Sequence, residues 1–117
     1  VIKERGKDKV IIATKAGNDF YFASKDNDEG YGPIQQTYTK EYLIFAAEQS
    51  IKRLKLDSLD ILQLHSPDLE KLERDEPWEA LEKLKKDGKI RHAGFSVQSF
   101  KETEQALNYN ASGICDY

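Results

Sequence analysis

The stretch that most constrains the fold is the apolar run from Leu59 to Leu64, which leads into His65 and is followed directly by Ser66 and Pro67. The run is too short for a helix and too apolar for a strand with one face in water, so it is typical of a parallel strand buried on both faces. Parallel α/β sheets and barrels hold their chemistry at the carboxyl ends of the strands. An imidazole at the last position of this strand makes His65 the first candidate functional residue.

The composition is that of an ordinary globular domain. The chain has 117 residues, of which 33% are charged and 38% hydrophobic, and a formal net charge of −3. The 18 basic residues are spread among 21 acidic ones without a basic face, so no nucleic-acid partner is expected. No apolar run approaches the ~20 residues that span a bilayer, so no membrane association is expected either. The single cysteine, Cys115, excludes a disulfide framework and a cysteine-based zinc cluster, and it suits a cytoplasmic protein without a metal site.

The remaining patterns predict strands that alternate with helices. Strands are predicted at residues 10–14, 59–65, 90–96 and 113–117. Helices are predicted between them: one capped by Thr39 with an apolar stripe that reaches Leu54, one that starts at Pro77 and stops before Gly88, and one with a capping box at Ser99. The segment 16–38 is predicted to be a long loop, in which the aromatic residues 20–22 could line a substrate pocket or, equally, form an ordinary packing cluster.

This order of elements predicts an α/β fold with a parallel sheet and right-handed crossovers. Two architectures fit it, namely a complete doubly wound sheet of four strands or about half of an eight-stranded (β/α)8 barrel. The chain starts at Val1, in what resembles the tail of a helix, and it contains no methionine. Because the last predicted strand is also cut short, we expect residues 1–117 to be a single domain that forms part of a (β/α)8 TIM barrel, truncated at both ends.

Polar side chains recur at the ends of successive predicted strands: Lys15, His65 and Ser96. A lysine there could hold an anion or favour the ionised form of a neighbouring acid. A neutral imidazole could donate a hydrogen bond to a carbonyl oxygen that gains negative charge, and a serine could hold a ligand amide. Each residue alone has an ordinary structural explanation, so it is their recurrence at equivalent places that favours a site. Tyr42 and Trp78 are predicted to be packing residues.

Four segments of the chain together resemble one known family, the aldo-keto reductases, in the right order and at fitting distances. The segments are residues 8–15 (DKVIIATK), 51–65 (from IKRL to LQLH), 78–91 (from WEAL to GKIR) and 94–96 (GFS). The resemblance implies a (β/α)8 barrel that reduces aldehydes and ketones with NADPH. It also implies that this chain supplies about the third to the sixth strand of the barrel.

The resemblance assigns a role to each candidate by position. Lys15 resembles the catalytic lysine that lowers the pKa of a tyrosine proton donor, and His65 resembles the catalytic histidine that orients and polarises the substrate carbonyl. Ser96 resembles the serine that contacts the nicotinamide carboxamide of the cofactor. The chain departs from the family at Val97, where asparagine is usual. The family's catalytic aspartate and tyrosine precede the first strand of this segment and are not in this sequence.

The implied function is NADPH-dependent reduction of a small-molecule carbonyl compound. An alternative is a regulatory subunit of the same fold that binds the nucleotide and turns over little, which Val97 favours, and a third is a complete doubly wound domain unrelated to reductases. Half a barrel would leave two outer strands unpaired. We therefore expect residues 1–117 alone neither to fold stably nor to catalyse, and to need the remainder of the barrel or an oligomeric partner.

Overall fold

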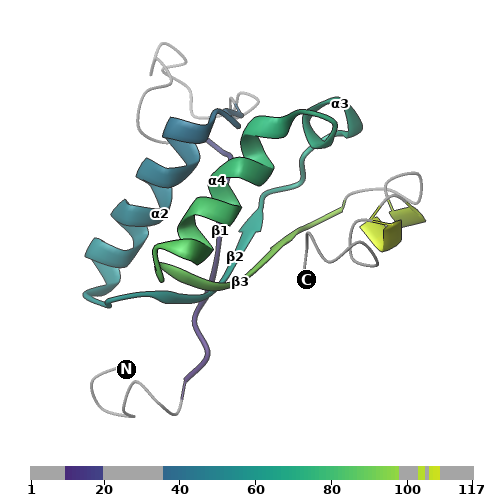
Figure 1. The fold of residues 1–117 in the computed structure, drawn as a ribbon. Helices are drawn as coiled ribbons and strands as arrows, with labels where there is room; N and C mark the ends of the chain where they lie inside the picture. Colours follow the sequence, from purple (N-terminus) through teal and green to yellow (C-terminus); the bar gives the residue numbers. More distant parts are fainter. Residues whose placement is uncertain (1–9, 20–35, 98–102, 105, 109–117) are drawn as a thin grey trace, which may run out of the picture.

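The computed structural model describes residues 10–19, 36–97, 103–104 and 106–108 (Figure 1). Its elements are, in chain order, β1 (Ala13–Ala16), α2 (Lys40–Leu54), β2 (Leu59–Leu64), α3 (Leu69–Leu72), α4 (Asp75–Lys86) and β3 (Ile90–Phe95). Residues 103–104 and 106–108 are helical, in agreement with the helix predicted after Ser99. The helix predicted to end near the start of the chain, the aromatic residues 20–22, the strand predicted at 113–117 and Cys115 lie outside the described residues.

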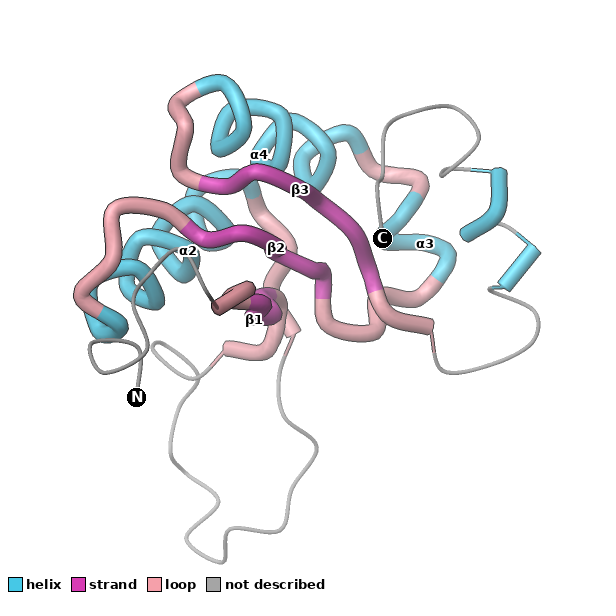
Figure 2. The backbone as a smooth tube through the Cα atoms, turned by 90° about the horizontal axis from the view of Figure 1, so that it is seen from below, coloured by secondary structure: helices cyan, strands magenta, loops and turns pink. Residues whose placement is uncertain are grey.

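The three strands form a parallel sheet in the order β1-β2-β3. Helices α2 and α4, which make the two crossovers, lie side by side on the same face of this sheet (Figures 1 and 2). A doubly wound sheet carries helices on both faces, whereas the strands of a (β/α)8 barrel carry them on the outer face alone. Two successive crossovers on the same face are what consecutive βαβ units of a barrel require, so the described part agrees with the predicted barrel.

Helix α2 begins where the sequence predicted it. The Thr39 side chain accepts a hydrogen bond from the backbone N–H of Tyr42, which satisfies one of the free donors of the first turn. The predicted apolar stripe faces the sheet at Leu43 but does not extend to the last residue, because Leu54 is 39% exposed. The helix ends at Lys55, which adopts the left-handed conformation at φ 56° and donates its backbone N–H back to the last turn.

The acidic connector after β2 contains structure that the sequence did not predict. The short helix α3 starts behind Asp68, whose carboxylate accepts the backbone N–H of Lys71 at 3.0 Å. This hydrogen bond holds the pKa of Asp68 below its ordinary value. Helix α4 then begins at Asp75, two residues before the predicted start at Pro77. Its predicted glycine stop is confirmed, since Gly88 follows the helix in the left-handed region at φ 74°.

Strand β1 is displaced along the chain from the predicted residues 10–14. The backbone N–H of Ile12 donates to the Asp60 carboxylate at 2.8 Å, and the strand starts only after it, at Ala13. It continues through Ala16, so Lys15 lies inside the strand and not after it. The strands predicted at 59–65 and 90–96 are confirmed as β2 and β3, each ending one residue earlier than predicted.

The core lies between the helical layer and the sheet. Its fully buried side chains come from both layers: Leu43 and Ala47 from α2, Ala80 and Leu84 from α4, and Leu62 and Leu64 from β2. Burial of one leucine side chain contributes about 1.5–3 kcal/mol, so these contacts hold both crossovers against the same face. These contacts also fix the positions of the strand ends at the carboxyl edge of the sheet.

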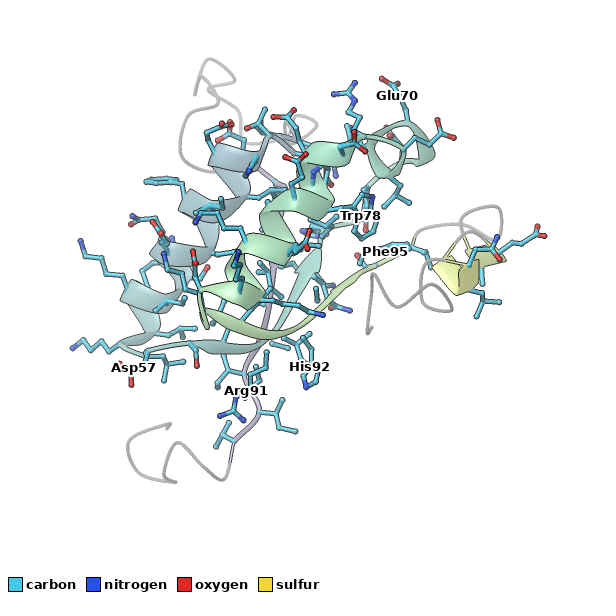
Figure 3. The ribbon with its side chains drawn as sticks, in the orientation of Figure 1. Asp57, Glu70, Trp78, Arg91, His92 and Phe95 are labelled. Carbon is cyan, nitrogen blue, oxygen red and sulfur yellow. The ribbon has the colours of Figure 1, made fainter. Side chains whose placement is uncertain are left out.

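Trp78 joins α4 to the carboxyl end of β3. Its ring meets the Phe95 ring edge to face, with 6.0 Å between centroids and 75° between planes (Figure 3). Its Nε1 donates to the backbone oxygen of Leu72 at 2.7 Å, which also ties α3 to α4. His92 projects from the middle of β3 away from the helices and is exposed (Figure 3).

Candidate functional site

The sheet register brings the three predicted residues to one edge. Lys15 is the third residue of β1. His65 directly follows β2, and its backbone N–H donates to the oxygen of Ala16 at 2.8 Å. Ser96 directly follows β3, and its N–H donates to the oxygen of Leu64 at 3.0 Å. The ladder therefore continues past both strands, and the three residues stand on neighbouring strands at their carboxyl ends.

Lys15 faces away from the helical layer. It is exposed, while the next residue, Ala16, is buried in the core. It is paired with Gln63, two residues before His65 on the neighbouring strand. Standard strand dimensions then separate the Cα atoms of Lys15 and His65 by about 8 Å, which a lysine side chain spans. Among the described residues, no ion pair or hydrogen bond is recorded for the Lys15 ammonium.

His65 is held at its ring and at its backbone by the segment between β1 and α2. Asn18 places its Nδ2 2.8 Å from Nδ1 of the imidazole. The backbone oxygen of His65 accepts the hydroxyl of Tyr38 at 2.6 Å and Nε2 of Gln36 at 3.2 Å. Asn18 and Gln36 face each other in an isolated antiparallel bridge, so the two ends of the long connection close over the end of β2.

Two tyrosines fix this connection to the sheet. The Tyr38 ring is 6% exposed and lies against Gly17, and the Tyr42 hydroxyl donates to the backbone oxygen of Asn18 at 2.8 Å. Burial raises the pKa of Tyr38 above its ordinary value, and the negative charge of Asp68 raises it further. The phenol is therefore a neutral hydrogen-bond donor throughout the physiological range.

We predict that Tyr38→Phe destabilises the full-length protein by about 0.5–1.5 kcal/mol at neutral pH, because one buried hydrogen bond to His65 is lost. The pKa of Tyr38 is higher in the folded protein than in the unfolded chain, where a tyrosine has a pKa of about 10. The stability that Tyr38 contributes is therefore complete below pH ~10 and is lost as the pH rises above it. Urea unfolding of parent and variant between neutral and alkaline pH measures this. The difference in unfolding free energy should narrow above pH ~10; a difference that stays constant would contradict the prediction.

The Ser96 hydroxyl is tied to the loop after β2. It accepts the backbone N–H of Ser66 at 2.9 Å, lies 3.1 Å from the Ser66 hydroxyl and is 3.5 Å from the backbone oxygen of Leu64. Ser66 adopts a left-handed φ of 48°, which is uncommon for a residue other than glycine, and the Ser96 contacts accompany it. The contact with the Leu64 oxygen is the longest of the three and therefore the weakest.

Sequence reasoning missed the residues that surround His65. Tyr42 was predicted to pack, and it does, but its hydroxyl also holds Asn18. Asn18, Gln36 and Tyr38 belong to the predicted long loop, where nothing in the local pattern connects a residue near its start with one near its end. The local signal that could have indicated a structural role is Tyr38, an aromatic residue directly before the Thr39 helix cap.

The described ranges contain no group of three or more His, Cys, Asp or Glu side chains placed to hold a metal ion. No helix in these ranges is long and apolar enough to cross a bilayer. The site is therefore described by its lysine, imidazole, hydroxyl and amide groups.

The described segment consists of parallel βαβ units with polar residues at the carboxyl ends of the strands. This is the arrangement of (β/α)8 barrel enzymes, which hold their active sites at that rim. The family model described as "Aldo/keto reductase family" matches residues 1–115. The chain belongs to the aldo/keto reductase family.

Individual relatives agree with this assignment. A glyoxal reductase of Bacillus subtilis is 36% identical over 108 residues, which is 91% of this chain and 32% of that protein. An L-glyceraldehyde 3-phosphate reductase of Escherichia coli is 31% identical over 86% of this chain and 26% of that protein. An aldo-keto reductase of Bacillus halodurans, solved in its holo form, matches with a TM-score of 0.72 at 32% identity over 92% of this chain and 33% of that one. The chain spans about a third or less of the length of these relatives.

Proposed function

We propose that the full-length protein is a cytoplasmic NADPH-dependent reductase of aldehydes or ketones, to which residues 1–117 contribute the third to the sixth strand of a (β/α)8 barrel. The observation that carries the proposal is the register of β1 and β2, which pairs Lys15 with Gln63 and continues to His65. An ammonium and an imidazole thus emerge from adjacent parallel strands at the edge where barrels hold their active sites.

Each residue has a definite task in this reaction. A reduced nicotinamide would supply the hydride to the carbonyl carbon. The Lys15 ammonium would favour ionisation of a tyrosine outside this chain that gives its proton to the carbonyl oxygen. The His65 imidazole would donate a hydrogen bond to the same oxygen and so stabilise the charge that develops on it. The Ser96 hydroxyl, which can both donate and accept, would hold the carboxamide of the cofactor.

The names of the relatives suggest the substrate class. One is a glyoxal reductase and another an L-glyceraldehyde 3-phosphate reductase, so small polar aldehydes are the substrates to test first. The ammonium, imidazole and amide groups at the carboxyl edge are hydrogen-bond donors, which suits a substrate rich in oxygen atoms.

We expect the full-length protein to oxidise NADPH in the presence of glyoxal, and His65→Gln to lower kcat by about 10²–10³-fold, because the donor to the carbonyl oxygen is displaced. NADPH affinity, followed by cofactor fluorescence, should stay close to that of the parent. The control is His92→Gln, which removes an exposed imidazole from the middle of the neighbouring strand. Equal rates for the parent and His65→Gln would remove His65 from the reaction.

A second candidate function is a nucleotide-binding regulatory subunit with little turnover. It is favoured by two features of the β3 end: Val97 is apolar and 41% exposed, and the Ser96 hydroxyl is already engaged by Ser66. Titration of NADPH fluorescence in parallel with the turnover assay separates the two functions. Tight binding without oxidation of NADPH by any aldehyde tested would support the regulatory subunit.

A further inference from the structure

We infer that Lys71, Gln36 and Asn18 form a one-directional chain of hydrogen bonds that fixes His65 as the tautomer with its proton on Nε2. Asn18 and Gln36 from the two ends of the connection between β1 and α2, and Lys71 from α3, meet at the carboxyl edge of the sheet in a chain that ends on Nδ1 of the imidazole. The tautomer follows from these contacts alone, and its consequence for catalysis rests on the function proposed above.

The direction of the chain is set at its outer end by Lys71. An ammonium group can only donate hydrogen bonds, and the Lys71 Nζ lies 3.3 Å from Oε1 of Gln36. The oxygen end of the Gln36 amide therefore faces Lys71, and its Nε2 points the other way. That nitrogen donates to the backbone oxygen of His65 at 3.2 Å and lies 3.4 Å from Oδ1 of Asn18.

The second amide repeats the orientation of the first. With Oδ1 accepting from Gln36, Asn18 turns its Nδ2 toward the imidazole, where it lies 2.8 Å from Nδ1. An amide nitrogen only donates, so Nδ1 of His65 must accept and must carry no proton. The oxygen and nitrogen of an amide are told apart by their hydrogen-bond partners, and here a partner that can only donate removes the ambiguity.

The reversed arrangement of Asn18 is unfavourable at its contact with Gln36. If the Asn18 amide were turned around, its NH₂ group would meet the NH₂ group of Gln36, and two donors would face each other. The backbone cannot shift to relieve this, because the Asn18 oxygen accepts the Tyr42 hydroxyl at 2.8 Å and the Gly17 oxygen accepts the N–H of Thr37 at 2.7 Å. A buried or half-buried donor without an acceptor costs about 1–3 kcal/mol, so the observed direction prevails.

Lys71 is itself held in place. Its ammonium pairs with the Asp68 carboxylate at 3.2 Å and lies 5.4 Å from the centroid of the Tyr38 ring. Its side chain is 25% exposed, so the cation sits at the rim between solvent and the amide pair. Cation–aromatic contact and the ion pair together keep the donor at the start of the chain.

The consequence for the reaction concerns the far nitrogen of the ring. With Nδ1 accepting from Asn18, the proton of a neutral His65 is on Nε2, which is the donor that a substrate carbonyl oxygen needs. The other tautomer would present a lone pair to that oxygen and repel it. Asn18, Gln36 and Lys71 are thus positioning residues, which act through His65 and not on the substrate.

The test uses the full-length protein labelled with ¹⁵N-histidine, whose ring nitrogens are read by two-bond ¹H–¹⁵N correlation. The His65 signals are identified by their loss in His65→Gln. We expect Nδ1 of the parent to show the shift of an unprotonated nitrogen and Nε2 that of a protonated one. A parent in which Nδ1 carries the proton would overturn the inference, whether or not the protein reduces aldehydes.

The decisive variant is Asn18→Asp, which replaces the donor by a carboxylate that can only accept. It should move the proton of His65 to Nδ1 and lower kcat by about 10²-fold, because the donor to the carbonyl oxygen is lost. Thr39→Asp is the matched control, since it adds the same charge at the start of α2 and remains a good helix cap. An unchanged His65 tautomer in Asn18→Asp would contradict the proposal.

Lys71→Met provides a second variant at a partly exposed position, in case Asn18→Asp fails to fold. Without the Lys71 ammonium, only the hydrogen bond from Gln36 Nε2 to the His65 backbone oxygen opposes a joint reversal of the two amides, so the His65 shifts should move part of the way toward the other tautomer and kcat should fall by a few-fold. Shifts identical to the parent would show that Lys71 does not set the direction. A parent with the expected tautomer but no turnover would instead count against the reductase function and leave the hydrogen-bond chain standing.

Discussion

Replacing Lys15 by methionine in the full-length protein is expected to lower kcat for aldehyde reduction by about 10²–10⁴-fold, the range over which a positioned acid–base group contributes. The ammonium would favour the ionised form of the tyrosine that delivers the proton, and methionine keeps the length of the side chain but not its charge. Lys15 is exposed, so the fold should be unaffected. The rate is measured by the loss of NADPH absorbance under saturating aldehyde.

The matched control is Lys52→Met, an exposed lysine in the last turn of α2. Helix α2 runs back across the sheet, so this turn lies at the opposite edge from the site (Figure 1). The control should retain the parent kcat. If Lys15→Met does the same, Lys15 is an ordinary solvated lysine and the proposed proton-transfer arrangement is wrong.

The largest effect on stability is expected for Gly17→Ala. Gly17 adopts φ 127°, and a Cβ atom there would lie 2.6 Å from Cε1 of the buried Tyr38 ring. Strained backbone and overpacking each cost about 1–3 kcal/mol, so the variant should lose about 2–6 kcal/mol of unfolding free energy. It should also lose activity, because the displaced Tyr38 hydroxyl holds the backbone oxygen of His65. Urea unfolding and the NADPH assay measure the two losses.

Gly88→Ala separates the two contributions. Gly88 has φ 74°, also in the left-handed region, but a Cβ atom there meets nothing within 4 Å. This variant should lose only the backbone contribution, about 1–2 kcal/mol. If Gly17→Ala costs no more than Gly88→Ala, the contact between Gly17 and Tyr38 is not a tight one.

The sequence was enough to locate most elements of the fold and two residues of the candidate site at their strand ends. The apolar run of β2, the Thr39 cap of α2 and the glycine after α4 are local signals, because each depends on residues within one or two turns. His65 and Ser96 follow their strands directly for the same reason: the end of a strand is marked by its own residues. The start of β1 was less predictable, because it depends on another strand. The Ile12 N–H donates to the side chain of Asp60 in β2, and β1 begins only after this residue.

The packing of the two crossovers and the environment of His65 were decided only by the tertiary structure. Whether two crossovers cover the same face depends on how α2 and α4 pack together, which the alternation of strands and helices leaves open. The amide chain joins Asn18, Gln36 and Lys71, which are far apart in the sequence and meet only when β1, β2 and α3 are assembled. Polar residues in a long connection carry no periodic pattern, because their partners are set by long-range contacts and not by neighbours along the chain.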